Sequence, residues 1–409
     1  MGCERMAART HVVVVDGTAV MAPPSGIDGR IRVLFCCTGV GIFNRGIESF
    51  FRQAFDALKS APDIDARLIK GGGDPSADEC VAACLPRTSR IAEVIGPLFR
   101  RNAYVVEQLS SLPSVVRYVR TFRPHVVFYS DSNLGFQLYR WRKQIGVPFR
   151  LLFSNGGPCH PPFDRTDFVH QVAPFYHEEA LQAGELAQRH FMVPYGLDVG
   201  PAPALDPSGR RSLRSRLGMP LDGPVVLTVG WISRQHKRMH YVIEELARLP
   251  KPRPYLQMLG AMDASSDEVV ALAETLLGRD GFSARSVPYV EVADYYRAAD
   301  LFVLASLQEG FGRVYLEALS HGLPVIAHRH PVTEYVLGDC GYLADLSKPD
   351  ELTGALATVL TLPLDQHRMT QRWASVRDRF SWKFLAPQYM RMFAAAAGVP
   401  ARSAGAGVA

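Results

Sequence analysis

Short apolar runs alternate along the chain with segments whose apolar positions recur at helical spacing. Runs of four to eight apolar residues are typical of strands buried in parallel sheets. The runs that we expect to form strands are Ile31–Cys37, His125–Ser130, Phe149–Ser154, Phe191–Pro194, Val225–Gly230, Tyr255–Gly260, Leu301–Ser306 and Pro324–Ala327.

Two of the intervening segments show the helical repeat clearly. The residues that form one apolar stripe in the first are Ile47, Phe50, Phe51, Ala54, Phe55 and Leu58, and in the second Phe311, Val314, Tyr315, Ala318 and Leu319. Residues three and four apart share a helix face, so each stripe faces a core. Alternating strands and helices predict an α/β protein with open parallel sheets covered on both faces.

A break in this alternation divides the chain of 409 residues. Between Gly196 and Gly223 there are several Pro, Gly and Arg residues without sustained periodicity, which is typical of a linker. We therefore expect two Rossmann-like domains, at 31–198 and 224–378, joined by a linker over 199–223. Ligands of such folds bind beyond the carboxyl ends of the strands, so the two domains would face each other across a cleft. Residues 1–30 fit no element and are expected to be a disordered leader, and 395–409 a loose tail.

Composition is that of an ordinary globular protein, with 47% hydrophobic and 21% charged residues. The net charge of +5 is too small to indicate a nucleic-acid partner. Seven cysteines without a Cys-x-x-Cys motif predict reduced thiols and a cytoplasmic location. No apolar run approaches the roughly 20 residues that cross a bilayer.

The charge is concentrated in one stretch. Between Arg90 and Arg150 there are ten basic and three acidic residues. One interpretation is a solvated face. The other is a surface that contacts anionic lipid at the inner membrane, or an anionic acceptor, because apolar residues such as Tyr104 and Val116 are interleaved with the charges.

A glycine-rich turn follows the first expected strand, running from Cys37 through Gly41 to Gly46, where the first helix begins. Free backbone N–H groups at such a helix N-terminus can hold a phosphate. Asn44 stands where the dinucleotide-binding fingerprint requires its third glycine, which argues against a Rossmann dehydrogenase, and no Gly-Lys-Ser/Thr follows. The glycines either cradle a phosphate or merely turn the chain.

The most informative segment runs from Ser306 to Ala327. Glu309 is placed at the end of a strand, and Gly310 and Gly312 would let backbone amides approach a ligand. Glu317 falls away from the apolar stripe of the following helix. Spacing alone favours a solvated Glu317 paired with Arg313, four residues earlier.

Glu309-Gly-Phe-Gly together with Glu317 resembles the Glu-x7-Glu signature of retaining GT-B glycosyltransferases, above all family 4 (glycosyl transferases group 1). Further pieces resemble the family in the right order over roughly residues 31–393: Val193–Asp198, Val229-Gly230 through Lys237, Tyr295–Ser306 and Phe380-Ser381-Trp382. The resemblance implies a GT-B fold, whose last helix, at 379–394, crosses back onto the N-terminal domain.

Roles follow from the resemblance for the matching positions. Glu317 would accept hydrogen bonds from the donor ribose, and Glu309 would meet hydroxyls of the transferred sugar. Lys237 would neutralise the leaving diphosphate. The remaining donor-binding candidates are the backbone around Gly310, Phe311, Gly312 and Arg313, and the loop flanked by Gly41 and Gly46.

Two positions are less well matched. Trp231 stands where the family usually has arginine, and Arg234 or Arg238 would have to supply the guanidinium; Trp231 itself would pack or stack on a base. His160, in the proline-rich loop 153–163, is a candidate for the acceptor side of the sugar pocket, with a surface or structural role as the alternative.

The resemblance implies transfer of a sugar from a nucleoside diphosphate sugar to an acceptor hydroxyl with retained configuration. It implies no metal or other cofactor, and we interpret Asp63-Ile64-Asp65 as loop and not as a metal site. The acceptor, the sugar and the base stay open. The alternatives are a GT-B sugar phosphorylase or nucleotide-sugar epimerase and a catalytically inactive nucleotide-sugar-binding protein.

Overall fold

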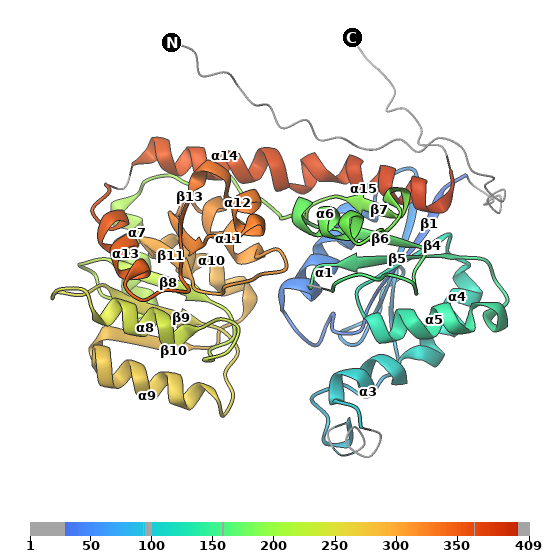
Figure 1. The fold of residues 1–409 in the computed structure, drawn as a ribbon, viewed down its shortest axis with the longest axis horizontal. Coiled ribbons are helices and arrows are strands. Elements are labelled where there is room, and N and C mark those ends of the chain that lie inside the picture. The colour runs from blue at the N-terminus through green and yellow to red at the C-terminus, as the bar shows by residue number, and fades with distance from the viewer. Residues whose placement is uncertain (1–28, 93, 95–99, 158, 364, 400–409) are drawn as a thin grey trace, which may run out of the picture.

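The computed structural model describes residues 29–92, 94, 100–157, 159–363 and 365–399, and over these residues it shows two α/β domains side by side (Figure 1). The N-terminal domain contains β1 Ile31–Cys37, α1 Gly46–Leu58, β2 Ile64–Lys70, β3 Glu79–Val81, α3 Ala103–Ser110, α4 Leu112–Phe122, β4 Val126–Tyr129, α5 Ser132–Ile145, β5 Arg150–Asn155, β6 Phe168–Gln171, α6 Pro174–Gln182 and β7 His190–Met192. The second domain contains α7 Pro207–Leu217, β8 Val225–Val229, α8 Met239–Ala247, β9 Tyr255–Leu259, α9 Ser266–Leu277, β10 Phe282–Arg285, α10 Tyr289–Ala298, β11 Leu301–Leu304, α11 Arg313–Ser320, β12 Val325–His328, α12 Pro331–Leu337, β13 Gly341–Ala344, α13 Glu351–Val359 and α14 Gln366–Phe380, and α15 Trp382–Ala397 ends the fold.

Each domain is built on one parallel sheet. The strand orders are β3-β2-β1-β4-β5-β6-β7 and β10-β9-β8-β11-β12-β13. The first strand of each domain therefore lies inside its sheet, and the order reverses beside it. The predicted fold class, two Rossmann-like parallel sheets, is confirmed.

All eight apolar runs form strands within two residues of the expected bounds, but five strands were not predicted. They are β2, β3, β6, β10 and β13. Three of them, β3, β10 and β13, are at sheet edges and only half buried. An edge strand packs one side against a neighbour and carries mixed side chains, so its sequence lacks a continuous apolar run.

The segment 199–223, expected as a linker, contains helix α7. Asp206 caps its N-terminus by accepting from the Gly209 N–H, and Gly218 ends it with a φ of +69°. Arg214 reaches the carbonyl of Ala298 at 2.9 Å and joins α7 to the end of α10. Leu213 and Leu217 are the apolar side chains of this arginine-rich helix, too few to give a visible repeat.

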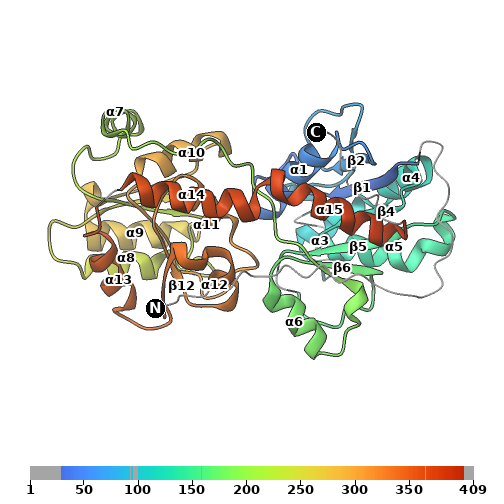
Figure 2. The same cartoon turned by 90° about the horizontal axis from the view of Figure 1, so that it is seen from above.

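The last two helices run along both domains, as seen from above in Figure 2. Helix α14 contacts α11 in the C-terminal domain, whereas α15 packs on α1, β1 and β4. Phe393 of α15 makes edge-to-face contacts with Phe35 and Phe128, at 5.7 and 5.4 Å between ring centroids. Ala395–Ala397, expected in the tail, form the last turn of α15. Residues 1–28 and 400–409 lie outside the described residues.

Candidate functional site

The acidic loop between β11 and α11 lies where the two domains touch. A Cβ atom on Gly310 would stand 2.1 Å from the carbonyl oxygen of Gly156, which follows β5. The Tyr176 hydroxyl, on α6 of the N-terminal domain, donates to the Glu309 carbonyl oxygen at 2.8 Å. The backbone of this loop is therefore in direct contact with the opposite domain.

The side chain of Glu309 is held within its own domain. It is 8% exposed, and its Oε1 atom accepts from the Lys237 ammonium group at 2.5 Å. The Nε2 atom of His236 lies 3.3 Å from the same oxygen. The stem of Lys237 packs against Gly230 at the end of β8, where a Cβ atom would stand 3.1 Å from it. The end of β8 and the end of β11 thus bring the predicted pair Glu309 and Lys237 together.

The surroundings of Glu309 determine its protonation state. Burial by itself would raise the pKa of Glu309, but the charge of Lys237 and the hydrogen bonds from His236 and Lys237 lower this pKa from 4.5 to about 2. Glu309 is therefore an anion at neutral pH. A buried anion and a cation at the strand ends provide one acceptor and one donor for a polar ligand.

Glu317 has partners that differ from the expected one. Its two carboxylate oxygens accept from the hydroxyls of Tyr289, at 3.2 Å, and Tyr296, at 3.1 Å. The expected pairing with Arg313 is wrong, because Arg313 is buried and donates to the Gly196 carbonyl and to Gln53 of α1. The Phe311 side chain is also buried, between Tyr195 and Phe380.

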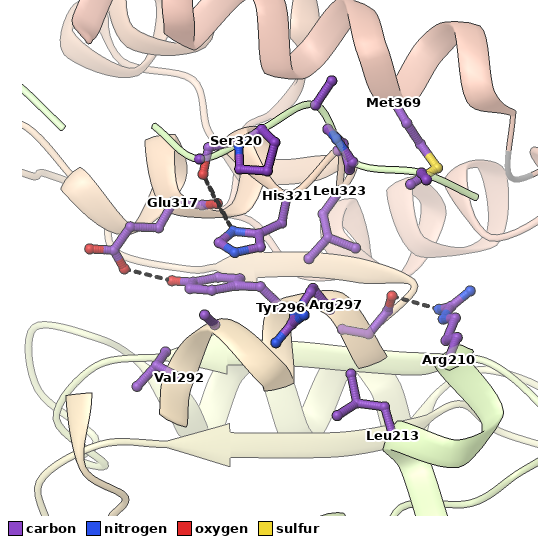
Figure 3. Close-up of a pocket in the computed structure, with 18 of the residues that line it drawn as sticks. Arg210, Leu213, Val292, Tyr296, Arg297, Glu317, Ser320, His321, Leu323 and Met369 are labelled. Carbon is purple, nitrogen blue, oxygen red and sulfur yellow. Dashed lines mark hydrogen bonds between the residues drawn. The ribbon is translucent and has the colours of Figure 1, made fainter. Parts of the chain in front are cut away.

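A cavity of about 970 Å³ opens beside Glu317. Figure 3 shows Glu317 at one end, with the Tyr296 hydroxyl directed at it and His321 lying against the Tyr296 ring. Helices α7 and α10, the chain at 197–206 and the start of α14 form its remaining walls. This cavity places Glu317 at an open surface and not in the core.

The glycine-rich turn of the N-terminal domain is interlocked with a second glycine loop. Gly41 has a φ of +83°, and a Cβ atom there would stand 2.1 Å from the carbonyl oxygen of Gly72. The N–H groups of Gly71 and Gly72 both donate to the Val40 carbonyl at 3.2 Å. Gly41 is thus required by chain packing, whereas Gly46 opens α1 with free space around it.

Two carboxyl groups lie beneath this turn. Glu48, in the first turn of α1, and Asp131, which accepts from the Thr38 N–H at 2.7 Å, are both buried. Burial is the main cause that raises the pKa of both groups. A phosphate bound here would meet these acids, so the chain-turning interpretation gains support at this end of the site.

The positions around Trp231 are more open than expected. Trp231 is 46% exposed, so packing does not account for it. The Arg238 guanidinium donates to the carbonyls of Ala305 and Leu346, which leaves it occupied within the domain. Arg234 is exposed and is the better placed of the two arginines to reach a ligand.

His160 lies in the loop that follows β5, in the N-terminal domain. Its side chain is mostly exposed, and Nδ1 lies 2.8 Å from Glu179 of α6. The Asn155 side chain holds the loop by bonding both backbone groups of Cys159. Asp65, expected in a loop, is part of β2 and lies 3.3 Å from Arg67. Among the described residues, no group of three or more His, Cys, Asp or Glu side chains could hold a metal.

Several residues of this site escaped the sequence analysis. They are Tyr176, His236, Tyr289, Tyr296 and the run Gly71–Gly73. The seven-residue spacing of Tyr289 and Tyr296 puts both on one helix face and was a usable signal. Tyr176 had none, because its contact joins positions 133 residues apart.

A comparison with known protein families finds a match to the domain that contains Glu309, Glu317 and Lys237. Residues 223–361 fit the family model described as Glycosyl transferases group 1, and this span includes Lys237, Glu309 and Glu317. The match of the C-terminal domain is thus to glycosyl transferases group 1. A D-inositol 3-phosphate glycosyltransferase of Segniliparus rotundus is 28% identical over 229 residues, 53% of this chain and 51% of the relative. A phosphatidyl-myo-inositol mannosyltransferase of Mycobacterium tuberculosis is 28% identical over 54% of this chain and 61% of the relative. The chain thus spans about half the length of the first of these relatives.

Solved structures extend the likeness from this domain to the whole fold. Sucrose-phosphate synthase from Thermosynechococcus elongatus superimposes with a TM-score of 0.68 over 90% of this chain and 100% of that one, at 20% identity. Anabaena Alr3699/HepE in complex with UDP-glucose gives 0.69 over 89% and 100%, at 17% identity. These likenesses establish the GT-B architecture. In the part of the chain that the structure describes, no helix is long and apolar enough to cross a membrane.

Proposed function

We propose that this protein transfers a sugar from a nucleoside diphosphate sugar to an acceptor hydroxyl, with retention of the anomeric configuration. The observation that carries the proposal is the ion pair of Lys237 with the buried Glu309, 2.5 Å apart, at the strand ends that face the N-terminal domain. The family match over the domain that supplies both residues supports it.

Glu317 binds the donor ribose in this proposal. Both of its carboxylate oxygens already accept from tyrosine hydroxyls, and such oxygens have further lone pairs for a ribose diol. Tyr289 and Tyr296 fix the direction of the carboxylate before the donor arrives. The cavity beside Glu317 leaves this residue accessible, and its lining includes neither Glu309 nor Lys237.

Lys237 and the start of α11 stabilise the leaving group. Charge develops on the diphosphate as the bond to the sugar breaks, and a fixed cation lowers the energy of that state. The backbone N–H groups at Gly310–Arg313 are at a helix N-terminus and contribute in the same direction. Arg234 is the candidate for the second cation. Glu309 meets sugar hydroxyls, and the acceptor hydroxyl enters on the face that the diphosphate leaves and gives its proton to the departing phosphate.

The acceptor side faces the N-terminal domain, where His160 is the candidate. The loop flanked by Gly41 and Gly46 stays a candidate for closing over the donor phosphates. Two relatives are named for lipids, an alpha-monoglucosyldiacylglycerol synthase and the phosphatidyl-myo-inositol mannosyltransferase. Helices α4 and α5 expose Arg117, Arg140 and Lys143 with Trp141 beside them. We propose that this face contacts an anionic membrane. Flotation with anionic and neutral vesicles tests it, and binding that is equal for both vesicles, or absent, overturns it.

The decisive test of function is a thermal-shift panel of nucleoside diphosphates and their sugars. A ligand at about 100 times its Kd adds about 2.7 kcal/mol of stability, a readily measured shift. We expect one base to stabilise the wild-type protein and Glu317→Ala to weaken that shift. The product anomer, determined by NMR with that donor, then tests retention. Stabilisation by phosphate and a free sugar in place of any nucleotide would favour the phosphorylase, whereas nucleotide binding without turnover would favour the inactive protein.

A further inference from the structure

Tyr176, on α6 of the N-terminal domain, makes a hydrogen bond to the acidic loop of the other domain. It is 1% exposed and donates to the Glu309 carbonyl oxygen at 2.8 Å. The side chain of the same glutamate is bonded to Lys237 of the C-terminal domain. Glu309 is therefore fixed from both domains, by its carboxylate on one side and by its backbone on the other.

The bond from Tyr176 determines how the peptide between Glu309 and Gly310 is turned. In a trans peptide the C=O and N–H groups point in opposite directions. Because the carbonyl points to Tyr176, the Gly310 N–H points away from α6. Glycine has no Cβ to resist rotation of this peptide, so an outside partner has to hold it.

The surroundings of Gly310 leave little room for another arrangement. A Cβ atom there would stand 2.1 Å from the Gly156 carbonyl oxygen, so the backbone of the N-terminal domain lies directly against this peptide. Phe311, the next residue, is anchored between Tyr195 and Phe380. The Tyr176 ring itself lies in the buried core beside Phe175, at 5.3 Å between centroids. Its hydroxyl is thus a fixed donor on a rigid helix.

We propose that Tyr176 is a positioning residue, which uses the contact between the two domains to set the orientation of the Glu309–Gly310 peptide and so presents the Gly310 N–H to the bound donor. The proposal rests on the proposed function, because it gives that N–H a sugar or diphosphate to meet. It adds a residue from the opposite domain to the donor site.

The test compares Tyr176→Phe with Tyr389→Phe. The Tyr389 hydroxyl is also buried and donates to a backbone carbonyl, that of Pro194, at 2.9 Å, far from the acidic loop in the chain. Both variants lose one tyrosine–carbonyl hydrogen bond and keep the ring, and Tyr389→Phe also loses a 3.4 Å contact of its hydroxyl with Nε2 of His170. We expect Tyr176→Phe to lower kcat about ten-fold and to change the Kd of the nucleoside diphosphate by less than this factor, since Glu317 is intact. Tyr389→Phe should keep the wild-type kcat.

Equal kcat in Tyr176→Phe and wild type, or an equal loss in both variants, would overturn the proposal. A second measurement does not depend on turnover. Hydrogen exchange of peptides covering 305–313 in the ligand-free protein should be faster in Tyr176→Phe than in Tyr389→Phe. If no nucleotide sugar is turned over, the proposed function fails while this exchange result still decides the positioning role: unchanged exchange excludes it.

Discussion

The ammonium group of Lys237 lies 2.5 Å from a carboxylate oxygen of Glu309, and both side chains are largely buried. One is supplied by the loop after β8 and the other by the loop after β11, which are neighbouring strands. Removing the cation leaves a buried anion without its main partner. The pair therefore connects stability of the C-terminal domain with the chemistry proposed for it.

Lys237→Ala is expected to reduce kcat by about 10²–10³, because the leaving group loses a positioned cation.

The same variant tests the pKa of Glu309. A lowered carboxyl pKa stabilises the fold above pH 4.5, and that stabilisation is lost as the pH falls towards about 2. The stability difference between wild type and variant, from urea unfolding, should thus shrink on acidification. A difference that is constant with pH would contradict the assignment.

Tyr296→Phe is expected to weaken nucleotide binding without unfolding the protein. The variant keeps the buried ring but removes the 3.1 Å hydrogen bond to Glu317. A hydrogen bond to a charged group contributes about 1.5–3 kcal/mol, which corresponds to a Kd at least ten-fold higher if Glu317 turns away. Calorimetric titration with the nucleoside diphosphate measures this. Tyr335→Phe serves as the control, because Tyr335 is on α12 and is not one of the two tyrosines that donate to Glu317.

Arg313→Met is expected to destabilise the protein by about 1–3 kcal/mol, because it leaves the Gly196 carbonyl and Gln53 without a buried donor. The matched control is Arg297→Met on α10. Arg297 is 58% exposed and paired with Asp294, so its loss should cost less than about 1 kcal/mol. Urea unfolding of both variants decides the point, and equal losses would show that Arg313 has no special role between the domains.

His170 predicts a second pH dependence. It is fully buried between Ser154 and the Val193 carbonyl, and burial lowers its pKa from 6.5 to about 4. Below pH 6.5 the unfolded chain binds a proton that the native protein does not, so stability falls until about pH 4, by about 3 kcal/mol. His170→Gln should reduce this slope, whereas His367→Gln, at an exposed position on α14, should keep it unchanged.

Metal removal supplies a further test. The proposed chemistry relies on Lys237 and on backbone amides, so excess EDTA should leave turnover of the nucleotide sugar unchanged. Loss of activity in EDTA that Mg²⁺ or Mn²⁺ restores would show that a divalent cation shares the diphosphate charge.

The acidic loop shows how far the sequence alone could go at the site. Glu309, Glu317 and Lys237 were identified by a resemblance with fixed order and spacing, and the structure brings Glu309 and Lys237 into contact. The partners of Glu317 were mispredicted, because helical spacing offers Arg313 as a neighbour but cannot tell that the arginine turns into the domain boundary. Tyr289 and Tyr296 of α10 donate to Glu317 instead.

The sequence by itself determined the two parallel sheets and their main strands, because a strand buried on both faces needs a continuous apolar run that local inspection finds. It also predicted the three charged residues of the candidate site, which belong to one domain and one motif order. Only the tertiary structure decided the edge strands, the helix within 199–223, the burial of Arg313 and the contact of Tyr176 with Glu309. These depend on which surfaces meet across distant parts of the chain, and such long-range contacts leave no local periodicity to be recognised.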